Sequence, residues 1–129
     1  MSGLKSLLSL ALVVGLAVPA QAADPAGIWL TGPDKNGQVA HVRATPCGPA
    51  FCGKIIRVFN ASGQAVNAPT VGKRVFWDMT GGSGLFQGRA YVPAHDRNYN
   101  AKMQVTGNRM KVSGCFGPVC QSQVWTRVK

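Results

Sequence analysis

Gly27-Ile28-Trp29 near the start and Trp125-Thr126-Arg127 near the end decide the fold that we predict for this 129-residue chain. Many small β-barrels carry a Gly-x-Trp on the first strand and a Trp-x-Arg on the last. Glycine lets another backbone approach closely, the indole fills the base, and a guanidinium stacks across its face. First and last strands meet only where a sheet closes on itself. We therefore predict a closed barrel, with Gly27, Trp29, Trp125 and Arg127 at its closure.

The chain after residue 22 shows no amphipathic helical pattern. Apolar and β-branched runs alternate instead with Gly, Pro and Asn, at intervals of about ten residues, which is typical of an all-β protein. A small polar segment over 60–70 is expected to be a loop. The predicted strands cover 27–32, 38–45, 51–59, 72–77, 85–92, 98–106, 109–116 and 121–128. They predict a single antiparallel up-and-down barrel of about eight strands.

Gly107-Asn108 is a two-residue signal for a tight hairpin turn. Folding the chain there pairs apolar or small residues on one face and polar residues on the other. The predicted pairs are Val105–Met110, Met103–Val112, Ala101–Gly114, Tyr99–Phe116, Gln104–Lys111 and Lys102–Ser113. Placing Cys115 opposite Cys120 continues this register and puts Gln121, Gln123, Trp125 and Arg127 on the inward side. The interior is therefore expected to be partly polar.

Four cysteines form two Cys-x4-Cys units, Cys47 with Cys52 and Cys115 with Cys120. Small exported domains often carry disulfides, and four cysteines allow three connectivities. We favour the two local pairs, each of which closes a short loop and stabilises the fold by only ~2 kcal/mol. Pairing the strands on either side of Cys47 and Cys52 does not phase cleanly, which indicates a bulge near Val42 or a different pairing.

Residues 1–22 have the parts of a secretory signal peptide: Lys5 at the start, an apolar stretch over 7–18, and the small-residue cleavage site Ala20-Gln21-Ala22. The apolar stretch is shorter than the roughly 20 residues that span a bilayer. We expect a signal peptide over 1–22 and one barrel domain over 23–129. The mature protein is expected to have no transmembrane segment and to be periplasmic or secreted.

The formal net charge is +10, with 14 Lys and Arg residues against four acidic ones. Such a surface attracts anions, for example glycolipid, phospholipid or wall polymer, although positive charge can also simply keep an exported protein soluble. The cations are scattered, with no run longer than Lys73-Arg74. A nucleic-acid partner is therefore not expected. The sequence does not set the oligomeric state.

Four segments, in this order and spacing, resemble a known family: Gly27-Ile28-Trp29, Cys52-Gly53-Lys54-Ile55, Gly88-Arg89-Ala90-Tyr91-Val92-Pro93 with Tyr99, and Ser122-Gln123-Val124-Trp125-Thr126-Arg127. The chain resembles the exported bacterial proteins grouped as domain of unknown function 2147. The resemblance implies a lipocalin-like β-barrel, secreted or periplasmic, with a cavity for a small molecule. It implies no particular ligand or activity.

The candidate ligand-binding residues lie near one predicted turn and on the last strand. Tyr91 and Tyr99 flank the turn and, with Arg89, are predicted to bind a ring or an anionic headgroup at the barrel mouth. The alternative is a structural cross-strand pair of aromatic rings. Gln121 and Gln123 are the polar candidates inside the barrel.

Catalytic and metal-binding patterns are weak. His95-Asp96 is the only adjacent imidazole and carboxylate, and it falls in an expected exposed turn between Pro93 and Asn98. There are no paired carboxylates for glycoside hydrolysis, and neither the histidines nor the cysteine units have zinc spacing. No catalytic residue, metal or cofactor is predicted.

We therefore expect an exported, non-enzymatic binding protein that holds a small apolar or amphipathic ligand in its barrel. The alternative is a basic envelope-surface protein with a filled barrel, which binds anionic glycolipid, wall polymer or a protein partner.

Overall fold

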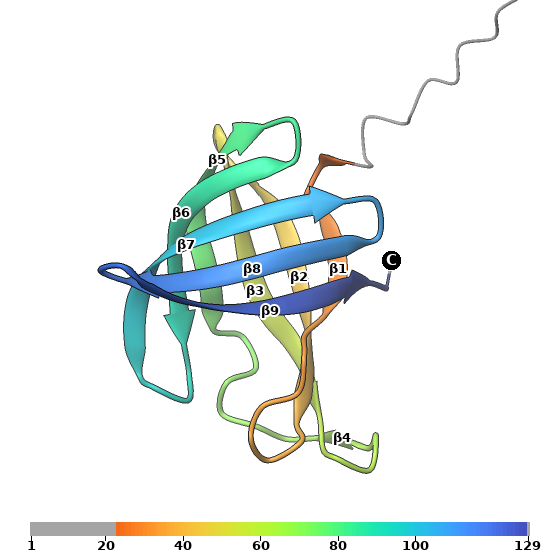
Figure 1. Ribbon diagram of the computed structural model, residues 1–129. Helices are drawn as coiled ribbons and strands as arrows, with labels where there is room; N and C mark the ends of the chain where they lie inside the picture. The colour runs from red at the N-terminus through yellow and green to blue at the C-terminus, as the bar shows by residue number, and fades with distance from the viewer. Residues whose placement is uncertain (1–22, 129) are drawn as a thin grey trace, which may run out of the picture.

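The computed structural model describes residues 23–128, which form one antiparallel β-barrel (Figure 1). The predicted signal peptide lies outside the described residues. The strands are β1 (Gly27–Leu30), β2 (Val39–Cys47), β3 (Ala50–Phe59), β4 (Ala65–Val66), β5 (Arg74–Gly82), β6 (Leu85–Val92), β7 (Arg97–Thr106), β8 (Arg109–Phe116) and β9 (Val119–Arg127). Eight strands form the wall, and among the described residues the two-residue β4 pairs only with the end of β3. The predicted all-β barrel is confirmed.

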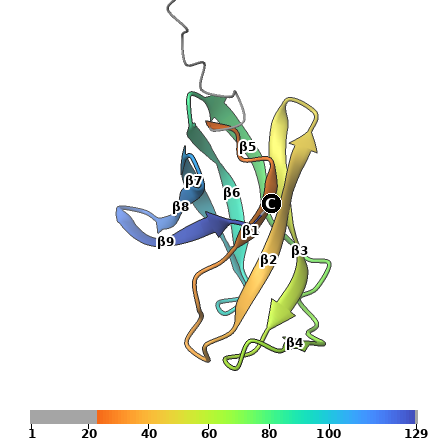
Figure 2. The same cartoon turned by 90° about the vertical axis from the view of Figure 1, so that its right-hand side faces the viewer.

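The barrel has up-and-down order, because each long strand pairs with the next one along the chain. The sheet closes between β1 and β9, where Trp29 lies opposite Arg127 and Leu30 opposite Thr126. The two terminal motifs therefore lie side by side. This seam has two residue pairs, whereas eight pairs join β8 to β9. In Figure 2 the turn end of the β8–β9 hairpin stands clear of β1 and β2.

The β7–β8 hairpin has the predicted register, including Val105 opposite Met110 and Ala101 opposite Gly114. Its ladder ends where Asn100 faces Cys115, so Tyr99 and Phe116 are not a ladder pair, although their ring centres lie 6.5 Å apart. The register continues into β9 as predicted, with Cys115 opposite Cys120, Val112 opposite Gln123 and Met110 opposite Trp125.

The fourth predicted strand, 72–77, is corrected to β5, Arg74–Gly82. Asp78 has a φ of 55°, and the pairing of β5 with β6 shifts between Trp77 and Thr80. Such a bulge interrupts the two-residue alternation from which strands are predicted. The sequence pattern therefore ends at residue 77 while the strand continues beyond it.

Both favoured disulfides are present, Cys47–Cys52 and Cys115–Cys120. The expected bulge between β2 and β3 lies between His41 and Val42, where His41 faces Arg57 and Val42 faces Ile55.

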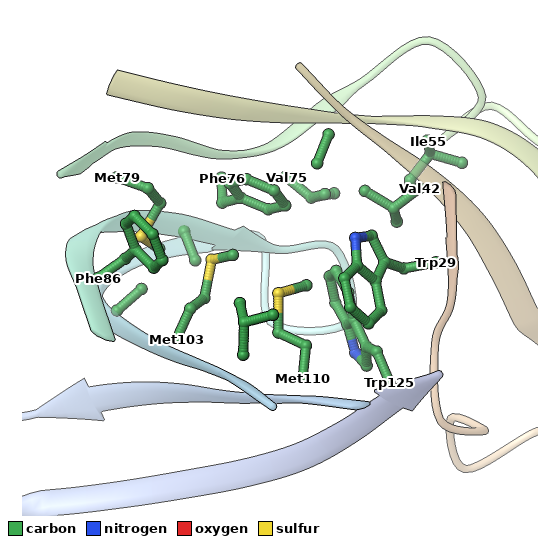
Figure 3. Close-up of a cluster of buried hydrophobic side chains, with 14 of the residues drawn as sticks. Trp29, Val42, Ile55, Val75, Phe76, Met79, Phe86, Met103, Met110 and Trp125 are labelled. Carbon is green, nitrogen blue, oxygen red and sulfur yellow. The ribbon is translucent and has the colours of Figure 1, made fainter. Parts of the chain in front are cut away.

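The core fills the barrel next to its closure. Figure 3 shows Met79 and Phe86 on one side, Trp29 and Trp125 on the other, and Met103 and Met110 between them. Trp29, Met79 and Met110 are completely buried. Gly53 on β3 is part of this packing, because a Cβ at that position would overlap the Phe76 ring.

Candidate ligand-binding site

One end of the barrel is sealed by Arg127 and Trp29. The guanidinium of Arg127 lies 4.3 Å from the ring centre of Trp29, a favourable cation–π distance. The Trp29 indole N–H donates to the Pro25 carbonyl at 2.8 Å. Arg127 donates to three carbonyl oxygens, those of Ala26 at 2.6 Å, Asp24 at 3.0 Å and Gly107 at 3.3 Å. One side chain thus joins the last strand to the N-terminal segment and to the β7–β8 turn.

The other end is open, because the seam between β1 and β9 is short. Beyond Leu30 the chain turns away into the β1–β2 loop, and the edge of β9 before Trp125 has no strand partner within residues 23–128. An open cavity of about 740 Å³ lies there, bordered by this edge, the β1–β2 loop and the β6–β7 turn. A volume of this order accommodates a small organic molecule.

The floor of the cavity is apolar. It includes Val42, Ile55, Phe76, Val112 and Trp125, which belong to the core or pack against it. The Trp125 indole N–H donates to the side-chain oxygen of Gln123 at 2.6 Å. The indole therefore presents no unpaired donor to an apolar ligand.

The rim of the cavity is mixed: two cations, Lys35 and Arg97, border it together with apolar side chains of the β6–β7 and β8–β9 turns. The Asp34 carboxylate also borders the cavity, but one of its oxygens accepts the backbone N–H groups of Asn36 at 2.8 Å and Gln38 at 2.9 Å. This carboxylate therefore shapes the β1–β2 loop. The rim suits the polar or negatively charged end of an amphipathic molecule.

The structure brings three of the five predicted ligand residues to the cavity wall from the inward side. Gln121 faces Gly114, Gln123 faces Val112, and Tyr99 lies next to Ala101 and opposite Ala90. Both glutamines are nevertheless exposed, since no strand covers this part of β9.

Tyr91 and Arg89 do not share a face of the sheet with Tyr99, although Tyr91 and Tyr99 both border the cavity, and their role in ligand binding stays a prediction. Val92 pairs with Arg97 across the β6–β7 turn, which puts Tyr91 opposite Asn98 and Arg89 opposite Asn100. Paired residues share a face of a sheet, so Tyr91 and Arg89 point outward and Tyr99 inward. Arg89 donates to the Asn100 side chain at 2.6 Å, and Tyr91 borders only the rim of the cavity.

The β6–β7 turn is held by two side-chain hydrogen bonds. The Tyr91 hydroxyl donates to the Asp96 carboxylate at 2.7 Å, and His95 Nδ1 lies 2.8 Å from the Tyr99 hydroxyl. The bond to Asp96 stabilises the protonated phenol, which raises the pKa of Tyr91. His95 and Asp96 therefore have structural partners at the rim.

His41 lies on β2 outside the cavity, with its ring centre 4.8 Å from that of Phe59. Burial lowers its pKa from the ordinary 6.5, and the nearby positive charge of Arg57 lowers it further. The neutral imidazole is thus the form that the fold prefers.

Sequence reasoning missed the rim residues Lys35, Gln38 and Arg97. Lys35 lies in the segment 33–37 between two predicted strands, and Gln38 begins the second of these strands. Nothing in the sequence around these residues showed that they border an opening. Within residues 23–128, no three His, Cys, Asp or Glu side chains are placed to hold a metal ion.

An up-and-down barrel with one sealed end and one open end over an apolar floor defines a lipocalin-like protein. The chain belongs to the family described as uncharacterized protein conserved in bacteria (DUF2147), whose model matches residues 27–127. This agrees with the resemblance seen in the sequence.

Among solved structures, the barrel is similar to protein HP1028 from the human pathogen Helicobacter pylori, described as belonging to the lipocalin family. The two share 15% sequence identity and superpose with a TM-score of 0.64, over 81% of this chain and 82% of that one. The similarity is one of fold. The comparison with curated proteins found no match. No helix in the described part of the chain is long and apolar enough to cross a membrane.

Proposed function

We propose that this protein is an exported, non-enzymatic carrier that holds a small amphipathic molecule in the open end of its barrel. The observation that carries the proposal is the 740 Å³ cavity, which has an apolar floor continuous with the core and two cations at its rim. Lipocalin-like barrels in general suit small ligands that enter through an open end.

The distribution of groups sets the orientation that we propose for the ligand. Its apolar part contacts Phe76, Val112 and Trp125, where burial of apolar area is favourable. Its polar end lies among Gln121, Lys35 and Arg97. Tyr99 and Gln123 lie between these two regions, and Gln123 is already bonded to Trp125.

Export to the periplasm or the exterior fits the disulfides, because such bonds persist mainly in oxidising compartments. The predicted signal peptide supports the same location.

Native mass spectrometry of protein purified from its own cell envelope tests the proposal. We expect a retained amphipathic molecule of constant mass, which the variant Gly114→Phe releases because its ring occupies the cavity. Gln104→Phe is the matched control, since it places the same ring on the outward face of the neighbouring strand. Retention by both variants, or by neither the wild type nor the control, contradicts the proposal.

A second function, recognition of an anionic envelope polymer, is supported by three outward cations on adjacent strands. Arg43 on β2 faces Lys54 on β3, which faces Arg74 on β5. Like charges directly opposite one another destabilise a sheet, so a bound polyanion would stabilise this row. The test is binding of an acidic polysaccharide. A weaker affinity in Lys54→Gln and loss of binding in high salt would support this function. Binding that survives both changes excludes this row as its site.

A further inference from the structure

The β8–β9 turn presents the most exposed large apolar side chains in the described chain. Phe116 is 65% exposed and Val119 is 64% exposed, and they face each other across the hairpin. Both lie on the inward face of the sheet, but the hairpin extends past the end of the seam, so no opposite wall covers them. Both also border the mouth of the cavity.

A disulfide constrains the backbone of this turn. The disulfide Cys115–Cys120 joins the two residues directly behind Phe116 and Val119, and Gly117-Pro118 forms the tight connection between them. A constrained backbone loses less conformational freedom when the tip docks, so the entropic cost of binding is lower than for a flexible loop.

Cations accompany these apolar groups. The Arg97 guanidinium lies 5.6 Å from the ring centre of Phe116, and Lys35 borders the same mouth. The whole chain has a formal net charge of +10. Exposed aromatic and aliphatic side chains beside Lys and Arg are the combination that binds the interface of an anionic bilayer.

We propose that the β8–β9 tip, Phe116 to Val119, docks onto anionic phospholipid membranes and turns the cavity mouth toward the bilayer. Burial of two apolar side chains, to which each cation near an anionic surface adds a favourable contribution, fits reversible docking at the membrane interface. They are far too small for a stable protein dimer, which buries roughly 1,200–2,000 Å². This inference deepens the proposed function. If the cavity binds an amphipathic ligand, as proposed above, a ligand dissolved in the bilayer would reach the cavity without crossing water.

The primary test is flotation of the purified, disulfide-bonded protein with two kinds of vesicle, phosphatidylcholine alone or with phosphatidylglycerol. We expect binding to the anionic vesicles, at least tenfold weaker binding to the neutral ones, and a similar loss for the double variant Phe116→Ser/Val119→Ser. Leu85→Ser is the matched control, because Leu85 is 60% exposed but begins β6 at the end away from the mouth. Equal binding by wild type and double variant overturns the proposal, as does an equal loss in the control.

A second readout reports insertion without removing apolar surface. Tryptophan at position 116, introduced by Phe116→Trp, should be quenched by brominated lipid several-fold more than tryptophan introduced by Leu85→Trp. Equal quenching of the two variants contradicts docking through this tip.

The variant Gly114→Phe separates this inference from the proposed function. If docking occurs through the tip, the variant with a filled cavity floats as the wild type does, even when ligand binding is lost. If it no longer floats, lipid was being drawn into the cavity, and the docking proposal fails. Conversion of a dimer to a monomer by the tip variant, with flotation unchanged, identifies a self-association surface and also overturns it.

Discussion

Gly114→Phe is the most informative single perturbation of this barrel, because it should remove ligand binding while raising stability. Gly114 lies on the inward face of β8, opposite Ala101 and Gln121, and borders the cavity. A Cβ at this position would lie 3.7 Å from Tyr99 Cβ and 3.9 Å from Tyr99 Cγ, which is ordinary van der Waals contact. The backbone therefore need not move to admit a Cβ at this position.

The stability change follows from glycine's freedom in the unfolded chain. Glycine inside a strand costs about 0.5–1 kcal/mol relative to alanine. Replacing it should therefore raise Tm by roughly 2–8 °C in a domain of this size. The phenylalanine side chain takes up the space of about seven ligand atoms. Each atom of a drug-sized ligand contributes about 0.3 kcal/mol to the binding free energy. The lost contacts amount to roughly 2 kcal/mol, or at least a ~30-fold weaker Kd.

The assay is a titration with a fluorescent amphipathic probe, repeated in high salt, together with thermal unfolding followed by circular dichroism. Binding in the cavity should persist in salt, disappear in Gly114→Phe and remain in Gln104→Phe. A raised Tm with unchanged probe affinity would falsify the assignment of the cavity as the binding site. A Tm lowered by several degrees would show instead that the space beside Tyr99 is already filled.

Three further predictions concern the fold. Gly53→Ala should destabilise the barrel by about 1–3 kcal/mol in urea unfolding, because its methyl group displaces the Phe76 ring; an unchanged midpoint contradicts that packing. Arg127→Ala should cost roughly 2–4 kcal/mol through the loss of its stacking on Trp29 and of its charged hydrogen bonds, and Arg127→Lys should restore only part of this. Because the folded state lowers the pKa of His41 from 6.5, the unfolded state binds the proton more readily. The contribution of His41 to the free energy of unfolding is therefore complete above pH 6.5 and is lost as the pH falls below 6.5 and past the folded pKa. In a series of Tm measurements against pH, His41→Gln should remove this part of the pH dependence.

The residues that set register could be predicted because their information is local. The turn Gly107-Asn108 fixes the pairing of β7 with β8, and Cys115 opposite Cys120 carries that register into β9. Strand alternation is a period-2 property of neighbouring residues, so it can be read from sequence wherever no bulge intervenes. Beside Val42 the register failed to phase, which indicated a bulge or a different pairing, and the structure has the bulge. The bulge at Asp78 was missed because the alternation of apolar and polar residues stops there, so the predicted strand ended at residue 77.

Whether Tyr91 and Tyr99 lie on the same face of the sheet depends on the number of residues in the β6–β7 turn. The alternation of apolar and polar residues does not reveal this number. The four-residue connection between Val92 and Arg97 places Tyr91 and Tyr99 on opposite faces. One residue more or fewer in that turn would reverse the relation, since a shift of one residue moves a side chain to the other face.

The sequence by itself determined that the chain is an all-β barrel whose terminal strands meet, because the closure motifs, turn signals and alternation are properties of short segments. Only the tertiary structure decided that the barrel is sealed at one end and open at the other. That asymmetry arises because β1 leaves β9 after two residue pairs, and the β1–β2 loop, the β6–β7 turn and the β8–β9 tip then surround the gap. The meeting of three segments far apart in the chain depends on how the whole sheet curves, which no local pattern contains.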